Sequence, residues 1–116
     1  MNNAIKWVTI PQWHLTRFVG LSNANGLFRV QLKGETMFLG CAAKGGLDGR
    51  LRAYRSAKGM GQNHHAGRLI YERRAAVEMQ IAVMDKPAEQ IELLLITELA
   101  KQRPLWNVPD GHRRKR

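Results

Sequence analysis

The sequence predicts a small α+β domain in which helices flank a three-stranded, mostly antiparallel sheet. Two observations lead to this prediction. Apolar and polar residues alternate between residues 26 and 40 and again over 74–84, as they do in half-buried strands. Over 47–58 and 87–103, apolar residues instead recur at the spacing of one helix face. The chain has 116 residues, which is the length of a single domain that can bury a core without cross-links.

The first 25 residues predict an N-terminal arm that packs a short helix or an irregular segment on the sheet. Pro11 suits the first turn of such a helix. The polar stretch SNANG, residues 22–26, then predicts a turn. The segment GLFRVQLKGETMFLG, residues 26–40, predicts a β-hairpin, because two apolar runs flank a turn that contains glycine.

A helix is expected over 47–58, with Leu47, Leu51 and Tyr54 on its buried face. The following residues, KGMGQNHHAG, predict a polar loop. The alternation in RAAVEMQIAVM predicts a third strand over 74–84.

The last helix is expected to begin near Pro87 and to end before Arg103-Pro104, because the residue before a proline disfavours the helical conformation. Its buried face consists of Ile91, Leu94, Leu95 and Leu99. We expect the basic tail, residues 109–116, to be disordered.

Charge indicates the class of partner. Nineteen Lys and Arg against nine Asp and Glu give a formal charge of +10 and a pI near 10.7. Such an excess favours a polyanionic partner, most often nucleic acid, although solubility alone or ribosome association would also account for it. The single cysteine, Cys41, excludes an internal disulfide and a Cys-rich zinc site. Neither a membrane span nor a secretory signal is evident, so we expect a cytoplasmic protein.

Five short patterns, in order along the chain, resemble the GIY-YIG endonuclease family, to which UvrC-like nuclease domains belong. They are Gly26-Leu27-Phe28, Phe38-Leu39-Gly40, Arg50 on the first helix, a glutamate on the last helix, and the pair Pro104 and Asn107. The resemblance covers residues 26–108. It implies a three-stranded antiparallel sheet flanked by helices and the hydrolysis of nucleic-acid phosphodiester bonds.

The resemblance also implies a role for Arg50 and for one glutamate. Arg50 would contact the scissile phosphate, which suits its planar, permanently charged group. The glutamate would hold a single Mg²⁺ or Mn²⁺ that keeps several waters. Glu92 lies about four helical turns before Asn107, which fits the family interval better than Glu89 or Glu98.

Two readings of Glu92 stay open. Helical spacing places it close to Leu99, beside the inward face, where a carboxylate needs a metal or a charged partner. It could equally be a helix-flank residue paired with a nearby Lys or Arg. An ungapped match to UvrC-like sequences would place the glutamate nearer Leu95, one turn further on.

The signature tyrosines of the family are absent. Phe28 and Phe38 keep the rings but have no hydroxyl that could orient water or contact the phosphate. Both could simply be core residues.

Other groups could replace the missing hydroxyls. Tyr54 lies four residues after Arg50 on the same helix face, and His65 could act as a general acid or base. Lys44 could contact phosphate. The alternative is a packed ring for Tyr54 and solvated surface side chains for His65 and Lys44.

Basic side chains near Arg50 are expected to bind nucleic acid without reading its sequence. They are Lys44, Arg52, Arg55 and Lys58. The first hypothesis is therefore a metal-dependent endonuclease, with DNA favoured over RNA and a homodimer or a partner protein left open. The second is a catalytically degenerate module that binds nucleic acid or regulates a partner. A third is a basic protein that assembles on RNA or ribosomes.

Overall fold

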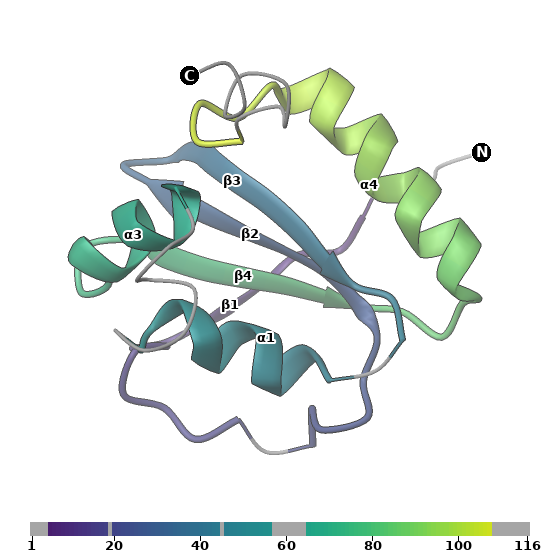
Figure 1. The fold of residues 1–116 in the computed structure, drawn as a ribbon, viewed down its shortest axis with the longest axis horizontal. Helices are drawn as coiled ribbons and strands as arrows, with labels where there is room; N and C mark the ends of the chain where they lie inside the picture. The colour runs from purple at the N-terminus through teal and green to yellow at the C-terminus, as the bar shows by residue number, and fades with distance from the viewer. Residues whose placement is uncertain (1–4, 19, 45, 57–64, 108–116) are drawn as a thin grey trace.

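The computed structural model describes residues 5–18, 20–44, 46–56 and 65–107. In chain order, its elements are β1 (Val8–Ile10), β2 (Gly26–Leu32), β3 (Glu35–Ala42), α1 (Leu47–Tyr54), α3 (His65–Glu72), β4 (Glu78–Val83) and α4 (Ala88–Gln102) (Figure 1). The strands form one antiparallel sheet in the order β1-β4-β2-β3. The α+β class predicted from the sequence is confirmed, and β3 is an edge strand of the sheet.

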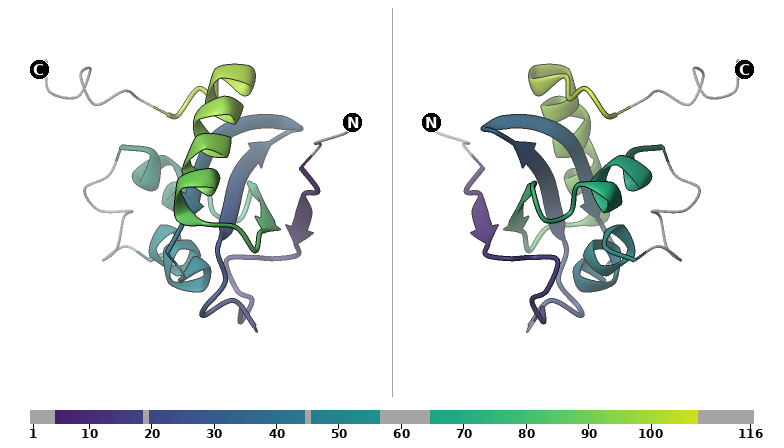
Figure 2. Two further views of the ribbon diagram at one scale, coloured as in Figure 1. Left: turned by 90° about the vertical axis from the view of Figure 1, so that its right-hand side faces the viewer. Right: turned by 90° about the vertical axis from the view of Figure 1, so that its left-hand side faces the viewer.

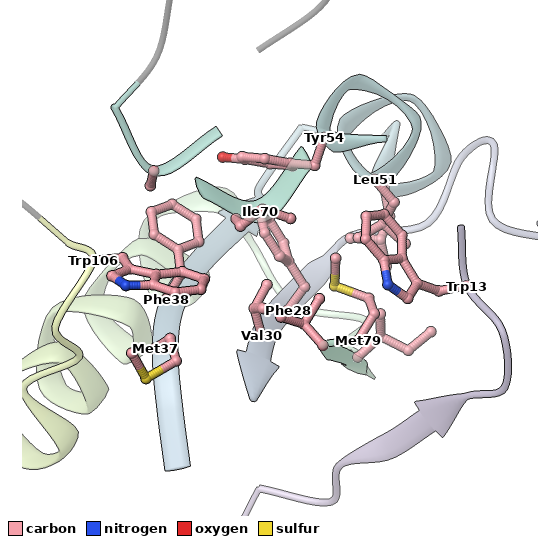
Figure 3. Close-up of a cluster of buried hydrophobic side chains, with 14 of the residues drawn as sticks. Trp13, Phe28, Val30, Met37, Phe38, Leu51, Tyr54, Ile70, Met79 and Trp106 are labelled. Carbon is pink, nitrogen blue, oxygen red and sulfur yellow. The ribbon is translucent and has the colours of Figure 1, made fainter. Parts of the chain in front are cut away.

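The two faces of the sheet carry different sets of apolar side chains, because successive residues of a strand point to opposite faces. One face contributes Phe28, Val30 and Phe38 to the main core, which α1 and α3 cover (Figure 3). Figure 2 shows α1 and α3 beside each other along one side of the molecule. Leu27 and Leu39 alternate with these residues, are buried on the other face, and are covered by α4.

The sheet has four strands where the sequence predicted three. Val8–Ile10 pairs antiparallel with β4 and places Val8 opposite Ile81. The expected helix or irregular arm at this point was therefore wrong. A three-residue strand is too short to show alternation, and its pairing with a segment some 70 residues away is tertiary information. Pro11 follows the strand and opens a turn instead of a helix.

A second difference is α3, which includes residues 65–67 of the predicted polar loop, whereas residues 58–64 of that loop lie outside the described residues. This helix buries Ala66, Gly67 and Ile70 and lies next to α1. It has only eight residues, and its histidine and glycine are typical of loops, so the spacing from Ala66 to Ile70 was too little to predict it. Residues 74–77 form a turn, and the strand predicted from position 74 begins at Glu78.

Helix α4 starts one residue after Pro87 and ends before Arg103, whose backbone adopts the left-handed conformation. Of its predicted buried face, Ile91 is buried and the three leucines are half-buried. Glu98 is also buried there, which the sequence did not predict. Its carboxylate accepts a hydrogen bond from Gln102 Nε2 at 2.7 Å and pairs with Lys101 Nζ at 3.1 Å, which offsets the cost of burying the charge. Among the described residues, no helix is long and apolar enough to cross a membrane.

The two glycines of the signature triplets are required by packing. A Cβ atom on Gly40 would lie 2.5 Å from Cζ of Phe28, because the ring rests directly on the glycine backbone. A Cβ atom on Gly26 would collide with the backbone carbonyl of Ala82 in β4. Close contacts across the hairpin and to β4 therefore explain both glycines without reference to chemistry.

We expect Gly40→Ala to lower the free energy of unfolding by about 1–3 kcal/mol, the usual cost of overpacking a core. Gly49→Ala is the matched control, because a Cβ atom there meets nothing within 4 Å and alanine is the better helix former. This control should leave stability unchanged or raise it by up to about 1 kcal/mol. Urea unfolding followed by circular dichroism measures both, and equal effects would contradict the packing role of Gly40.

Candidate functional site

Phe28, Phe38 and Tyr54 form a cluster of three rings beneath α1 (Figure 3). Their centroids lie 6.0 Å apart for the two phenylalanines, 5.5 Å for Phe28 and Tyr54, and 5.6 Å for Phe38 and Tyr54. The residues are 1%, 7% and 2% exposed, respectively. The two phenylalanines are therefore core residues, and their rings take no part in proton transfer.

Tyr54 brings a hydroxyl to this cluster, and Figure 3 shows the oxygen pointing away from α1. Burial raises the pKa of the phenol well above its ordinary value of 10.0, and the positive charge of Arg50 opposes the shift only in part. The phenol is consequently neutral at physiological pH. In that form it can donate a hydrogen bond, but it is a poor general base.

Arg50 and Glu92 lie near the same point of β3, although they belong to helices on different faces of the sheet. Both residues are exposed. Burial raises the pKa of the Cys41 thiol on β3, while the charge of Arg50 lowers it and that of Glu92 raises it. Since both charges act on one thiol, the arginine and the carboxylate each lie within electrostatic range of Cys41 on this edge strand.

Of the two interpretations left open for Glu92, its exposure favours a residue at the flank of α4 over a carboxylate turned inward. The buried stripe of this helix runs through Ile91, Leu95 and Glu98, and Glu92 falls at its margin, in solvent. Leu95, where an ungapped match would place the family glutamate, is half-buried and has no metal-binding atom.

Asn107 closes the open edge of β3. Its side-chain Oδ1 accepts a hydrogen bond from the backbone N–H of Leu39 at 2.9 Å, and its Nδ2 donates to the Leu39 carbonyl at 3.0 Å. The backbone N–H of Trp106 donates to the carbonyl of Met37 at 2.7 Å. The segment after α4 thus satisfies backbone groups that an edge strand would otherwise leave unpaired.

The remaining predicted residues are dispersed. His65 is exposed at the first position of α3, and Lys44 is exposed between β3 and α1. Arg52 pairs with Asp48 at 3.5 Å. Arg55 is half-buried against the segment before β2, where it lies beside Arg17, which sequence reasoning missed. Lys58 and the tail, residues 109–116, lie outside the described residues.

The donor set limits what metal the site can hold. Within the part of the chain that the structure describes, no group of three or more His, Cys, Asp or Glu side chains is placed to bind an ion. Mg²⁺ is often held by one or two carboxylates and several waters. Glu92, exposed on α4 and within electrostatic range of Cys41, fits such a water-rich ion and does not provide a closed cage.

Comparison with solved structures identifies the fold. The GIY-YIG N-terminal endonuclease domain of UvrC from Thermotoga maritima, bound to magnesium, matches with a TM-score of 0.60 and 23% identity over 78% of this chain and 90% of that one. The chain has the GIY-YIG fold. Two variants of that domain with a tyrosine replaced by phenylalanine, both bound to the catalytic divalent cation, match at the same TM-score and coverage with 24% identity. No family model and no curated protein matches the sequence.

The GIY-YIG fold explains why residues far apart in the sequence meet around β2 and β3. The two triplets occupy neighbouring positions, because Phe28 and Gly40 are partners in the β2–β3 register. Local patterns were enough to find them. Arg17 and Cys41 were missed because their neighbours come from other elements, and no pattern around either residue indicates those neighbours.

Replacing Asn107 by alanine removes both hydrogen bonds to Leu39, and we expect it to lower the free energy of unfolding by about 1–3 kcal/mol. Asn23→Ala is the matched control, because Asn23 is exposed in a turn, and it should stay within about 0.5 kcal/mol of the parent protein. Chemical denaturation measures both variants. A loss no larger than that of the control would show that the segment after α4 contributes nothing to the sheet edge.

The raised pKa of Tyr54 predicts a pH dependence of stability. The fold favours the neutral phenol, so its contribution is complete below about pH 10 and is lost above that value, as the unfolded chain ionises first. Between about pH 10 and 11, the parent protein should lose up to about 1.4 kcal/mol per pH unit more than Tyr54→Phe. Urea unfolding across this range measures the difference, and parallel curves would contradict it. Other titrating groups are common to both proteins and cancel.

Proposed function

We propose that the protein is an endonuclease that hydrolyses DNA phosphodiester bonds with one divalent cation, Mg²⁺ or Mn²⁺, held by Glu92. The observation that carries this proposal is that the charges of Arg50 and Glu92 both act on Cys41 of β3, in a domain with the GIY-YIG fold. An exposed guanidinium and an exposed carboxylate at one place supply an anchor for a phosphate and a ligand for a metal.

Each residue has a separate task in this proposal. Arg50 binds the scissile phosphate through its planar donors and neutralises charge that develops in the transition state. The phenol of Tyr54 is neutral and lies within electrostatic range of Arg50. It would act as a hydrogen-bond donor near the phosphate bound by Arg50. When bound, the cation supplies a nucleophilic water of lowered pKa and positive charge near the reacting oxygens.

The phenylalanines at the signature positions are compatible with metal binding. The UvrC domain from Thermotoga maritima holds its catalytic divalent cation in variants that carry phenylalanine in place of a tyrosine. By analogy, Phe28 and Phe38 need not prevent this chain from binding a cation. They would instead slow the chemical step, because neither ring can orient or deprotonate water.

The formal charge of +10 supports a nucleic-acid substrate. A single site cuts one strand at a time, so nicked circles are the first product expected from a supercoiled plasmid. Linear product that appears without a nicked intermediate would indicate a second copy of the chain or a partner protein.

A second candidate function is binding without cleavage, or regulation of a partner. The burial of Phe28 and Phe38 favours it, because no hydroxyl replaces theirs within the ring cluster except that of Tyr54. The position of Leu95 on α4 favours it as well, since Glu92 must hold the ion from one turn earlier. In this case Arg50 and the neighbouring arginines would bind phosphates, and no bond would be cut.

Plasmid nicking in Mg²⁺ or Mn²⁺ distinguishes the two functions. We expect Arg50→Ala to reduce the nicking rate by about 10²-fold or more, as the loss of one transition-state donor does in other enzymes. Glu92→Gln should reduce it at least as much, because the amide no longer supplies the negative charge that holds the ion. Glu89→Gln is the control, since Glu89 is an exposed carboxylate one turn earlier on the same helix, and it should keep the parent rate.

Nicking that survives both Arg50→Ala and Glu92→Gln would rule out the assigned site. Retardation of the plasmid without nicks, in either metal, would support the binding module and exclude the endonuclease.

A further inference from the structure

A second basic site lies on the other flank of α1 from Arg50. A cavity of about 410 Å³ separates this helix from the segment at residues 15–18, and it is lined by Arg17, Arg52 and Arg55 together with Asp48 and Phe18. Its volume falls within the roughly 300–1,000 Å³ of small-ligand pockets. The segment belongs to the N-terminal arm, outside the predicted nuclease domain of residues 26–108.

Arg55 connects the end of α1 to the segment at residues 13–18 and so fixes the shape of this cavity. Its Nη1 donates hydrogen bonds to the backbone carbonyls of Trp13 and Thr16, each at 2.6 Å. Its guanidinium carbon lies 4.5 Å from the centroid of the Phe18 ring. Trp13 is itself anchored in the core and donates from Nε1 to the Arg74 carbonyl at 3.0 Å. The cavity is therefore formed before any ligand binds, which lowers the cost of ordering on binding.

The charges around the cavity favour an anion. Three guanidinium groups face one carboxylate, and Asp48 is already paired with Arg52 at 3.5 Å. Burial and the charge of Arg52 both lower the pKa of Arg55, so its positive charge is partly desolvated and lies close to a like charge. A bound anion would relieve that repulsion.

The geometry and charge of this cavity lead us to propose that it binds a backbone phosphate of the nucleic acid, distinct from the phosphate at Arg50. Arg50 lies on α1 and Arg55 is the C-cap residue of this helix, five residues further on. At helical spacing the two fall on opposite flanks of the buried stripe, so a helix about 10–12 Å in diameter separates the two sites. The inference rests on the proposed function, because it takes the ligand to be the same DNA.

Apolar surface at the cavity favours a nucleotide unit over a bare inorganic ion. Leu15 is 74% exposed at the rim, and the half-buried Phe18 ring lines the wall. Such surfaces can contact a sugar or a base next to the phosphate. A phosphodiester within a strand and the phosphate of a free nucleotide share this chemistry, and the experiment has to distinguish them.

Fluorescence anisotropy with a labelled DNA duplex across a salt series tests the site without requiring cleavage. Arg17→Gln should weaken binding several-fold and reduce the slope of log K against log salt by about 0.9, the value for one lost phosphate contact. Lys33→Asn is the control. It also removes one exposed positive charge, but from the hairpin turn at the end of β3 remote from Cys41, and asparagine tolerates the left-handed backbone there. The control should keep the parent slope.

Asp48→Asn adds a test whose expected result is tighter binding of the duplex, which a misfolded protein would not show. The amide oxygen can still accept the hydrogen bond from the Gly49 N–H, while the negative charge that competes with a phosphate is gone. This variant should bind the duplex several-fold more tightly than the parent protein. Arg55 itself is avoided, because its removal would release the segment that forms the cavity.

Two outcomes would overturn the proposal. One is an equal loss of slope in Arg17→Gln and Lys33→Asn, which would mean that any surface charge contributes. Another is a nucleoside monophosphate that raises the melting temperature in an Arg17-dependent way while Arg17→Gln leaves duplex binding unchanged. That result would assign the cavity to free nucleotides.

The two proposals can fail separately. Loss of nicking in Arg50→Ala, together with unchanged duplex binding in Arg17→Gln, overturns the cavity proposal and leaves the endonuclease. If instead the salt slope depends on Arg17 and the protein never nicks DNA, the endonuclease proposal is overturned and the cavity proposal stands.

Discussion

The contact between the Phe28 ring and Gly40 is the constraint on which the rest of the structure depends. The ring rests on the backbone of the neighbouring strand where a Cβ atom would otherwise stand. From that position it meets Phe38 and Tyr54, and Tyr54 fixes the face of α1 that carries Arg50 next to β3. Gly40 belongs to a signature triplet, but packing against the Phe28 ring is enough to require it. It would be needed whether or not the protein cuts DNA.

The proposed function uses groups that lie around the edge strand β3. An edge offers unpaired backbone groups, and here Asn107 satisfies those of Leu39. Two residues further along, Cys41 lies within reach of the charges of Arg50 and Glu92. Because β3 has a strand on one side only, helices from both faces of the sheet can bring side chains to its free side. A central strand would not allow that convergence.

Local sequence patterns were sufficient for β2, β3, β4 and α4, because each is long enough to show its period. They failed for β1 and α3, whose few residues acquire their structure from contacts with β4 and α1. For the site, the resemblance indicated Arg50, whose role stays a prediction, and the sequence left open whether Glu92 faces inward or lies exposed on the helix flank, as it does. The position of Leu99 alone does not locate the buried face of α4. Glu98 is buried as well, and it places the centre of that face further from Glu92. Arg17 was missed because its neighbours Arg52 and Arg55 lie 35 or more residues further along the chain.

Binding and cleavage place different demands on this fold. The proposed cleavage would use polar groups near the ring cluster, and each buried hydroxyl there must be hydrogen-bonded or it costs stability. Phe28 and Phe38 avoid that cost and keep the cluster largely apolar. In the proposed function, phosphate binding depends on arginines at the surface, whose charge does not depend on hydroxyl groups at positions 28 and 38. In the proposed function, the absence of the two hydroxyls therefore bears on the chemical step and leaves the charged flanks of α1 intact, so that binding of nucleic acid and its cleavage can be separated.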